Sequence, residues 1–256
     1  ILIVDDGGER ERHCGILLGV PSTTGVEEKK TLAGSLKGKL SIAIRNEATS
    51  EEKCFQPVVE SSNILPSPIG TYYNVLREKG ERFAVDTVVV DCGYRMTDIL
   101  TICDGEIAVP ACRATADSAE TVVVELERAI EEHTGVEIEI DDLMLAIRKG
   151  MTKGATDVLK SQIVGRTAER IADRVEDILL TLAPDKVEHV MITGGGAHLF
   201  ACQLTSLLLE RKILKSASRI IVPEDPLTAN VKGLQTLARE AWEVQSEHGS
   251  DDLLSK

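Results

Sequence analysis

An apolar run that ends in three consecutive glycines constrains the fold of this chain more than any other segment. The run reads VMITGGGAHLF and occupies residues 190–200. Each glycine loses about 0.5–1 kcal/mol of stability relative to alanine, so a mere connector would rarely carry three. A helix that starts directly after them offers N–H groups and the positive end of its dipole. The segment therefore predicts a buried strand, a tight turn and a helix start that binds an anion; a flexible strand–helix loop is the alternative.

Apolar strands and amphipathic helices alternate along much of the chain. Asp117 and Glu120 open one helix with the spacing of a capping box, and Gly135 ends it. Strands that alternate with helices are typical of an α/β protein. The expected strands cover residues 15–21, 39–45, 87–93 and 187–196, and the expected helices cover 117–133, 166–183, 228–244, a segment after the glycines and one that begins near Thr71.

A second informative segment, VVVDCGYRMTDIL, occupies residues 88–100. Two apolar runs flank Asp91, Gly93, Thr97 and Asp98, which predicts a hairpin whose tip carries an acid, a glycine and several backbone N–H groups. Such a tip can surround an anion with N–H donors while the acid holds the counter-cation. Glycine lets the backbone approach a phosphate because it has no Cβ. A plain β-hairpin with Asp and Gly in its turn is the alternative.

A third segment, PEDPLTANVKGLQTLA, occupies residues 223–238. Pro226 ends an extended stretch, and Ala229, Asn230 and Gly233 then place small residues on one side of a helix start. Small residues at this spacing permit another helix to approach closely. An ordinary helix that tolerates one glycine is the alternative for this segment taken alone.

Composition and charge exclude several classes of function. A net charge of −13 and an aromatic content of 3% argue against direct binding of nucleic acid, which needs excess Lys and Arg or stacking aromatics. No apolar run reaches the roughly 18 residues of a membrane helix, so no membrane span is expected. The six cysteines lack CxxC spacing and the five histidines lack an HExxH pattern. These patterns predict reduced thiols, a cytoplasmic location and no zinc site.

In their order and spacing, the three segments resemble motifs of the prokaryotic actin-like ATPases of the ParM and MreB type. These proteins belong to a superfamily with heat-shock chaperones and sugar kinases. The resemblance spans roughly residues 15 to 240. Residues 91–98 are similar to the second phosphate motif, 193–197 to the adenosine motif, 225–234 to the second connector between lobes, 19–30 to an MreB-type strand and turn, and 65–73 to a ParM-type first connector.

The resemblance implies an α/β actin-like fold with two lobes around a nucleotide cleft and a truncated or reduced first lobe. Residues 1–100 form a partial first lobe, with the second phosphate hairpin at 87–100 beginning the second lobe. Residues 101–228 form the second lobe with the adenosine motif, and 229–256 form a helix returning to the first lobe and a polar tail. The family's first phosphate hairpin is not evident, because VDDGG at 4–8 reads as a charged turn.

The resemblance also implies a site for ATP or ADP with Mg²⁺. Asp91 would act in catalysis and organise the magnesium and its waters. The residues expected to bind the cofactor are Gly93, Tyr94, Arg95 and Thr97 of the phosphate motif, and Gly194, Gly195, Gly196 and Ala197 of the adenosine motif.

One catalytic position departs from the family pattern. The residue that positions the attacking water, a Glu or Gln in such proteins, falls at Ser67, whose hydroxyl is too short for this task. We therefore expect an ATPase with slow hydrolysis that assembles into homopolymer filaments to position a plasmid, an organelle or a cell structure, with an adaptor protein as a possible partner. The alternatives are a non-polymerising ATPase of the chaperone or reactivase type, and a degenerate actin-like scaffold.

Overall fold

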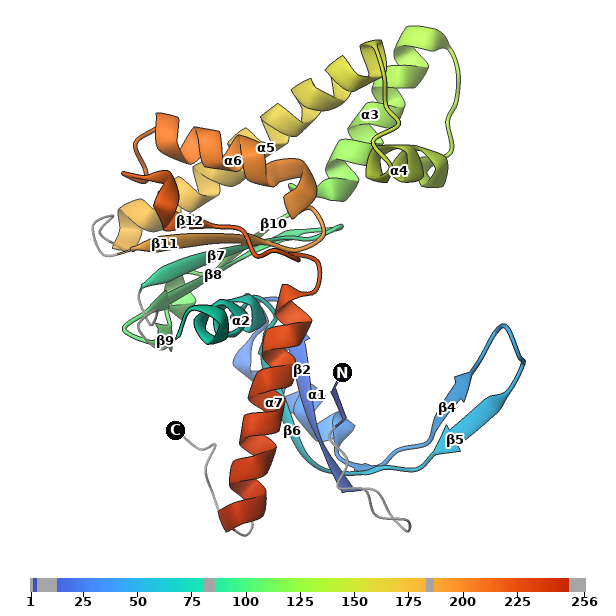
Figure 1. The fold of residues 1–256 in the computed structure, drawn as a ribbon, viewed down its shortest axis with the longest axis vertical. Helices are drawn as coiled ribbons and strands as arrows, with labels where there is room; N and C mark the ends of the chain where they lie inside the picture. The colour runs from blue at the N-terminus through green and yellow to red at the C-terminus, as the bar shows by residue number, and fades with distance from the viewer. Residues whose placement is uncertain (1, 4–12, 81–85, 183–186, 249–256) are drawn as a thin grey trace.

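The computed structural model describes residues 2–3, 13–80, 86–182 and 187–248 (Figure 1). The VDDGG turn at residues 4–8 and the tail from residue 249 onward lie outside these ranges. Two β-sheets and the helices around them make up the described part of the chain. No helix within these ranges is both long and apolar enough to cross a membrane.

The larger sheet, called here the second sheet, is built around β7 (Thr87–Cys92). β7 pairs antiparallel with β8 (Thr97–Cys103) and parallel with β11 (His189–Thr193). Its other strands are β9 (Glu106–Ile107), β10 (Arg113–Thr115) and β12 (Ile220–Ile221). The helices of this part of the chain are α3 (Ala119–Thr134), α4 (Ile140–Arg148), α5 (Ala155–Leu182) and α6 (Ala197–Glu210), with the 3₁₀ turns η2 (Val109–Ala111) and η3 (Ala217–Arg219). Helices α3, α5 and α6 lie on one side of this sheet (Figure 1).

The apolar residues of β7 are buried on both faces of the second sheet. Val88 and Val90 belong to the core beneath α3, α5 and α6, whereas Val89 belongs to the core on the opposite face. Successive residues of a strand point to opposite faces. A strand covered on both sides therefore reads as an unbroken apolar run, which explains why this strand is evident in the sequence.

The smaller sheet, called here the first sheet, has the strand order β1–β2–β6–β3. Its two central strands, β2 and β6, are parallel, and the helix of residues 26–36 connects β2 to the edge strand β3. Its elements are β1 (Leu2–Ile3), β2 (His13–Val20), β3 (Gly38–Lys39), β6 (Val58–Pro66) and α1 (Val26–Leu36). The strands β4 (Ile42–Arg45) and β5 (Glu52–Phe55) form a separate hairpin that projects from the body (Figure 1).

Helices α2 (Ile69–Lys79) and α7 (Ala229–His248) cross one another between the two sheets (Figure 1). A Cβ on Gly70 would overlap the carbonyl group of Asn230, and a Cβ on Gly233 would overlap the carbonyl oxygen of Gly70. The two helices therefore touch backbone to backbone. The expectation that small residues at 229–233 admit a close helix neighbour is confirmed.

The strand expected at residues 39–45 is wrong in its extent. Residues 38–39 pair with β6, whereas residues 42–45 pair with β5 in the separate hairpin. Between the two pieces, the Leu40 N–H donates to the Pro57 carbonyl at 2.9 Å. Pro57 has no N–H to return, so the ladder is interrupted there.

Other elements differ from their expected bounds, for reasons that lie in polar residues and glycine. β6 escapes the apolar pattern because it carries Ser61, Ser62 and Asn63, and Ser62 Oγ donates to a carbonyl of α1 at 2.6 Å. The helix expected at 166–183 begins at residue 155, because Gly165 is accommodated inside α5. The capping box at Asp117 is wrong: Ser118 is the N-cap residue of α3, and the Asp117 carboxylate instead pairs with Arg170. Gly135 ends α3 in the left-handed conformation as expected.

Candidate functional site

The hairpin expected at residues 87–100 is confirmed. Strands β7 and β8 are joined by a loop at residues 93–96, whose side chains at Tyr94, Arg95 and Met96 are exposed. The Gly93 N–H donates to the Met96 carbonyl at 3.0 Å, and a Cβ on Gly93 would lie 2.6 Å from that oxygen. Glycine is thus required by the loop's own backbone.

The start of α3 binds the carbonyl groups of this loop. The Ala119 N–H donates to the Gly93 carbonyl at 3.3 Å, and the Glu120 N–H donates to the Tyr94 carbonyl at 2.8 Å. Within the described residues, no backbone acceptor is present for the N–H groups of Tyr94 and Arg95. These two donors are therefore available to an anion at the exposed tip.

Asp91 lies near the end of β7, where the hairpin meets the glycine turn. Its Oδ2 accepts a hydrogen bond from Asn230 Nδ2 at 2.7 Å. A Cβ on Gly194 would overlap Asp91 Oδ1, and Gly194 has a φ of +84°, so only glycine suits this position. Burial raises the pKa of Asp91 to about 6; the bond from Asn230 opposes this shift, and the charge of Asp98 adds to it. A nearby cation would stabilise the ionised form of such a carboxylate and lower its pKa.

Asp91 should make folding stability fall as the pH rises from about 4 to about 6. Over this range the folded chain keeps a proton on Asp91 (pKa about 6), whereas the unfolded chain, with an ordinary value of 3.8, has released it. The loss of folding stability is complete once the pH is well above 6, where Asp91 is ionised in both states. In urea unfolding, the free energy of unfolding of Asp91→Asn should therefore increase relative to that of the wild type as the pH rises from 4.5 to 7. A difference that is constant across this range would contradict the assignment.

The triple glycine forms a tight turn that packs against the end of β7. The N–H of Gly194 donates to the Pro226 carbonyl at 2.9 Å, and the N–H of Gly196 donates to the Cys92 carbonyl at 2.6 Å. Helix α6 begins at Ala197, as expected. The N–H of Ala197 donates to the Gly194 carbonyl at 3.1 Å. Of the three glycines only Gly195 is exposed, so the turn is accessible from solvent at this residue.

Two polar residues of β8 serve contacts within the protein. Thr97 is fully buried, and its hydroxyl donates to the Asp117 carbonyl at 2.6 Å. The Asp98 carboxylate accepts the Ser22 N–H at 2.7 Å and also the Ser22 hydroxyl, which joins the hairpin to the loop after β2. Asp98 lies directly opposite Asp91 across the hairpin, so both side chains are on one face.

Ser67 lies in the turn between β6 and α2. Its N–H donates to the Val20 carbonyl at 2.7 Å, and its Oγ lies 2.6 Å from the position of a Cβ on Gly19. Ser67 is therefore packed on the end of β2. Within the described residues no hydrogen bond joins Ser67 to Asp91.

The donor set around Asp91 suits a cation that also binds phosphate oxygens and water. No cluster of three or more His, Cys, Asp or Glu side chains that could hold a metal ion occurs in the described ranges. Mg²⁺ is commonly held by one or two carboxylates together with substrate phosphates and water. Asp91 can supply one such carboxylate. The described residues around it do not provide enough ligands for a metal site made only of protein groups.

Asn230 is a site residue whose role the sequence does not reveal. Besides donating to Asp91, its Oδ1 accepts from the Thr71 N–H at 3.2 Å and from Thr71 Oγ1 at 2.7 Å. Thr71 Oγ1 also lies 2.8 Å from Thr193 Oγ1, the last residue of β11. In the sequence, Asn230 is recognisable only as an amide among small residues at the start of a helix. This pattern does not identify the hydrogen-bond partners of Asn230.

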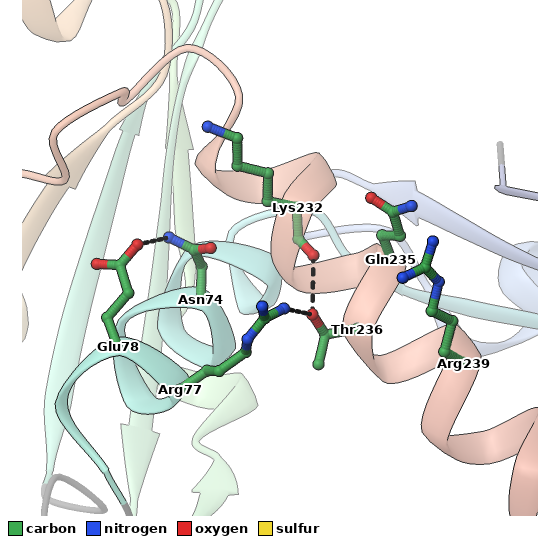
Figure 2. Close-up of a pocket in the computed structure, with 7 residues that line it drawn as sticks. All are labelled: Asn74, Arg77, Glu78, Lys232, Gln235, Thr236 and Arg239. Atoms are coloured by element: carbon green, nitrogen blue, oxygen red, sulfur yellow. Dashed lines mark hydrogen bonds between the residues drawn. The ribbon is translucent and has the colours of Figure 1, made fainter.

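A separate pocket of about 260 Å³ lies on the outer side of the α2–α7 crossing (Figure 2). Arg77 of α2 reaches Thr236 of α7 there, with Nη1 donating to Oγ1 at 3.0 Å. None of the residues expected to bind nucleotide lines this pocket. Its lining consists of Asn74, Arg77, Glu78, Lys232, Gln235, Thr236 and Arg239.

Comparison with known proteins connects this geometry to a family. Residues 89–206, a little under half of the chain, match the family described as archaeal actin homologue MreB-like, C-terminal. This match contains both the hairpin with Asp91 and the triple-glycine turn. Solved structures of actin homologues superimpose on most of the chain, with TM-scores of 0.66 to 0.69 for those described below. The chain therefore has the actin-like fold, and its residues 89–206 are similar to this archaeal family.

Three structures show the extent of the similarity. The archaeal actin homologue Ta0583 in complex with ADP is 23% identical, with a TM-score of 0.66 over 88% of this chain and 72% of that one. A 15-stranded ParM filament from Clostridium botulinum is 16% identical, with a TM-score of 0.66 over 88% and 66%. The MamK double helical filament is 15% identical, with a TM-score of 0.69 over 91% and 71%.

The TM-scores show that this chain shares the fold of the three structures. The chain spans 66% to 72% of their lengths. No curated protein matches the sequence. The expected α/β actin-like fold is therefore confirmed, whereas the ligand and the activity rest on the residues of the site.

Proposed function

We propose that this protein binds ATP or ADP with Mg²⁺ at the junction of the hairpin and the glycine turn, and that ATP binding drives its assembly into filaments. The observation that carries the proposal is Asp91, a largely buried carboxylate with a raised pKa beside two glycine-dependent turns. A negative charge held in this position without a cation partner is unfavourable. A bound divalent cation removes that cost.

The residues around Asp91 have the chemistry to hold a nucleotide. The N–H groups of Tyr94 and Arg95 suit the terminal phosphates, and the exposed Gly195 suits the ribose and the first phosphate. Thr97 acts by fixing the hairpin on α3, since its hydroxyl is used inside the protein. Mg²⁺ supplies charge neutralisation of the phosphates when it is bound.

The two sheets correspond to the two lobes in this proposal. Residues 1–100 contain the first lobe and the start of the second, 101–228 complete the second lobe, and α7 returns to the first. Two of the similar structures are filaments, which supports self-association of this chain. An adaptor protein is the proposed link to cargo, and the location is cytoplasmic.

Binding of Mg-ATP to the purified protein tests the proposal. Isothermal titration calorimetry should give saturable binding of ATP and ADP in the presence of Mg²⁺, and much weaker binding in EDTA. No heat of binding from either nucleotide, with a protein shown to be folded by circular dichroism, would contradict it.

Slow hydrolysis is expected because Ser67 occupies the place of the water-positioning residue. A hydroxyl on a short side chain cannot orient the attacking water as an amide or carboxylate does. Ser67→Gln should therefore raise the turnover of ATP by about tenfold or more, measured by phosphate release, while the affinity for ATP stays similar. Thr236→Gln, on the far side of the α2–α7 crossing, serves as a control that should leave turnover unchanged. A wild-type turnover that Ser67→Gln does not increase would contradict this role, and the complete absence of turnover in both would favour a nucleotide-binding scaffold.

A further inference from the structure

A chain of hydrogen bonds links Asp91 to the crossing of α2 and α7 and to the loop before α7. Asn230 Nδ2 donates to Asp91, and Asn230 Oδ1 faces Thr71 Oγ1 at 2.7 Å. Thr71 Oγ1 faces Thr193 Oγ1 at 2.8 Å, and Thr193 Oγ1 faces the Pro226 carbonyl at 3.1 Å. Thr71 and Thr193 are fully buried, so water does not share these contacts.

The two hydroxyl groups have too few protons to satisfy all three contacts. Each hydroxyl donates one proton, and both ends of the chain, the amide oxygen and the carbonyl oxygen, can only accept. With the central contact in use, the protons run either from Thr193 through Thr71 to Asn230, or from Thr71 through Thr193 to Pro226. The remaining acceptor is still satisfied, because Asn230 Oδ1 also accepts the Thr71 N–H and the Pro226 carbonyl also accepts the Gly194 N–H. Two arrangements of nearly equal quality therefore exist.

The charge of Asp91 decides between the two arrangements. A carboxylate that accepts from Asn230 Nδ2 polarises the amide and makes Oδ1 a stronger acceptor. The hydroxyl protons then run toward Asn230 and strengthen its bond to α2. When the charge of Asp91 is neutralised, Oδ1 weakens as an acceptor and the protons run toward Pro226, in the loop that holds Gly194.

We propose that Asn230, Thr71 and Thr193 form a hydrogen-bond relay through which the charge on Asp91 is sensed at the α2–α7 crossing and at the glycine turn. Asn230 and Thr71 are positioning residues in this relay. In the proposed function, on which this reading of the relay rests, a bound cation is what neutralises Asp91. The relay itself is a property of the protein without nucleotide.

A double-mutant cycle in nucleotide-free protein tests the relay. No hydrogen bond joins Asp91 to Thr71 directly in the described part of the chain, and the side-chain bonds that connect them run through Asn230. The free energies of unfolding in urea are measured for the wild type, Asp91→Asn, Thr71→Val and the double variant at pH 8. Thr71→Val should cost at least about fivefold more in the unfolding equilibrium constant when Asp91 is present than when Asn replaces it, a difference of about 1 kcal/mol.

Three companion variants make the cycle decisive. Thr71→Ser keeps the hydroxyl and should show the same response to Asp91→Asn as the wild type. Thr236→Val removes a hydroxyl from α7, the helix that carries Asn230, at a position away from Asp91, and should be additive with Asp91→Asn within about twofold. If Thr71→Val does not fold, Thr71→Ala takes its place in the cycle. Additivity within about twofold between Asp91→Asn and the variant that removes the Thr71 hydroxyl would overturn the relay. Because no nucleotide is present, the cycle gives its answer even if calorimetry shows that ATP does not bind.

Discussion

Asp91→Asn is expected to lower the affinity for Mg-ATP by about 100-fold or more. The substitution removes the carboxylate that would contact the cation, and loss of a buried charge partner is worth about 3 kcal/mol, which corresponds to this factor. Asparagine has nearly the same shape, and its Oδ1 can still accept the bond from Asn230 Nδ2. The fold should therefore persist, and the measured change should report on binding.

Isothermal titration calorimetry of the wild type and Asp91→Asn measures this change directly. The matched control is Asp157→Asn, which removes the same charge from a half-exposed position on α5 where Asp157 pairs with Lys160. The control should bind within about twofold of the wild type, since exposed ion pairs contribute little and lie under solvent screening. Equal affinities for the wild type and Asp91→Asn would exclude Asp91 from the site.

Gly233→Ala is expected to lower the free energy of unfolding by about 3 kcal/mol or more. The added Cβ would overlap the Gly70 carbonyl oxygen, and neither group is on a flexible side chain that could move aside. The helices α2 and α7 would have to separate, which also displaces Asn230 from Asp91 and Thr71. Gly70→Ala should have a similar effect, because its Cβ would overlap the carbonyl group of Asn230.

Gly165→Ala is the matched control for the glycine variants. Gly165 lies inside α5, and a Cβ there has no neighbour within 4 Å. Alanine should stabilise the helix by about 0.5–1 kcal/mol. Urea unfolding of the three variants checks these expectations, and a Gly233→Ala protein as stable as the wild type would show that the helices do not touch at this point.

The sequence predicts the fold where apolar pattern and glycine coincide. The strand at Thr87–Cys92 is evident because it is covered on both faces, and the helix at Ala197 is evident because glycines end the strand before it. The strand Val58–Pro66 is missed because it contains polar residues. One of them, Ser62, donates its hydroxyl hydrogen bond to a carbonyl of α1, a partner that no local pattern reveals. A polar residue satisfied by a distant element therefore hides this strand from a local pattern.

The same reason limits prediction of the site. Asp91 and Gly194 are identified by their local motifs, and the structure places the glycine against the carboxylate. The roles of Asn230 and Thr71 depend on contacts between residues 139 to 159 positions apart, which a single sequence does not show. The sequence predicts that Thr97 binds the ligand, whereas in the structure its hydroxyl donates to the Asp117 carbonyl.

Nucleotide-driven assembly is tested by 90° light scattering of the purified protein and by sedimentation of the same samples. The protein is compared in Mg-ATP, in Mg-ADP and without nucleotide, with negative-stain microscopy of each pellet. We expect a rise in scattering and filaments in the pellet with Mg-ATP, and little or no pellet without nucleotide. No assembly in Mg-ATP, or equal assembly in all three conditions, would contradict it.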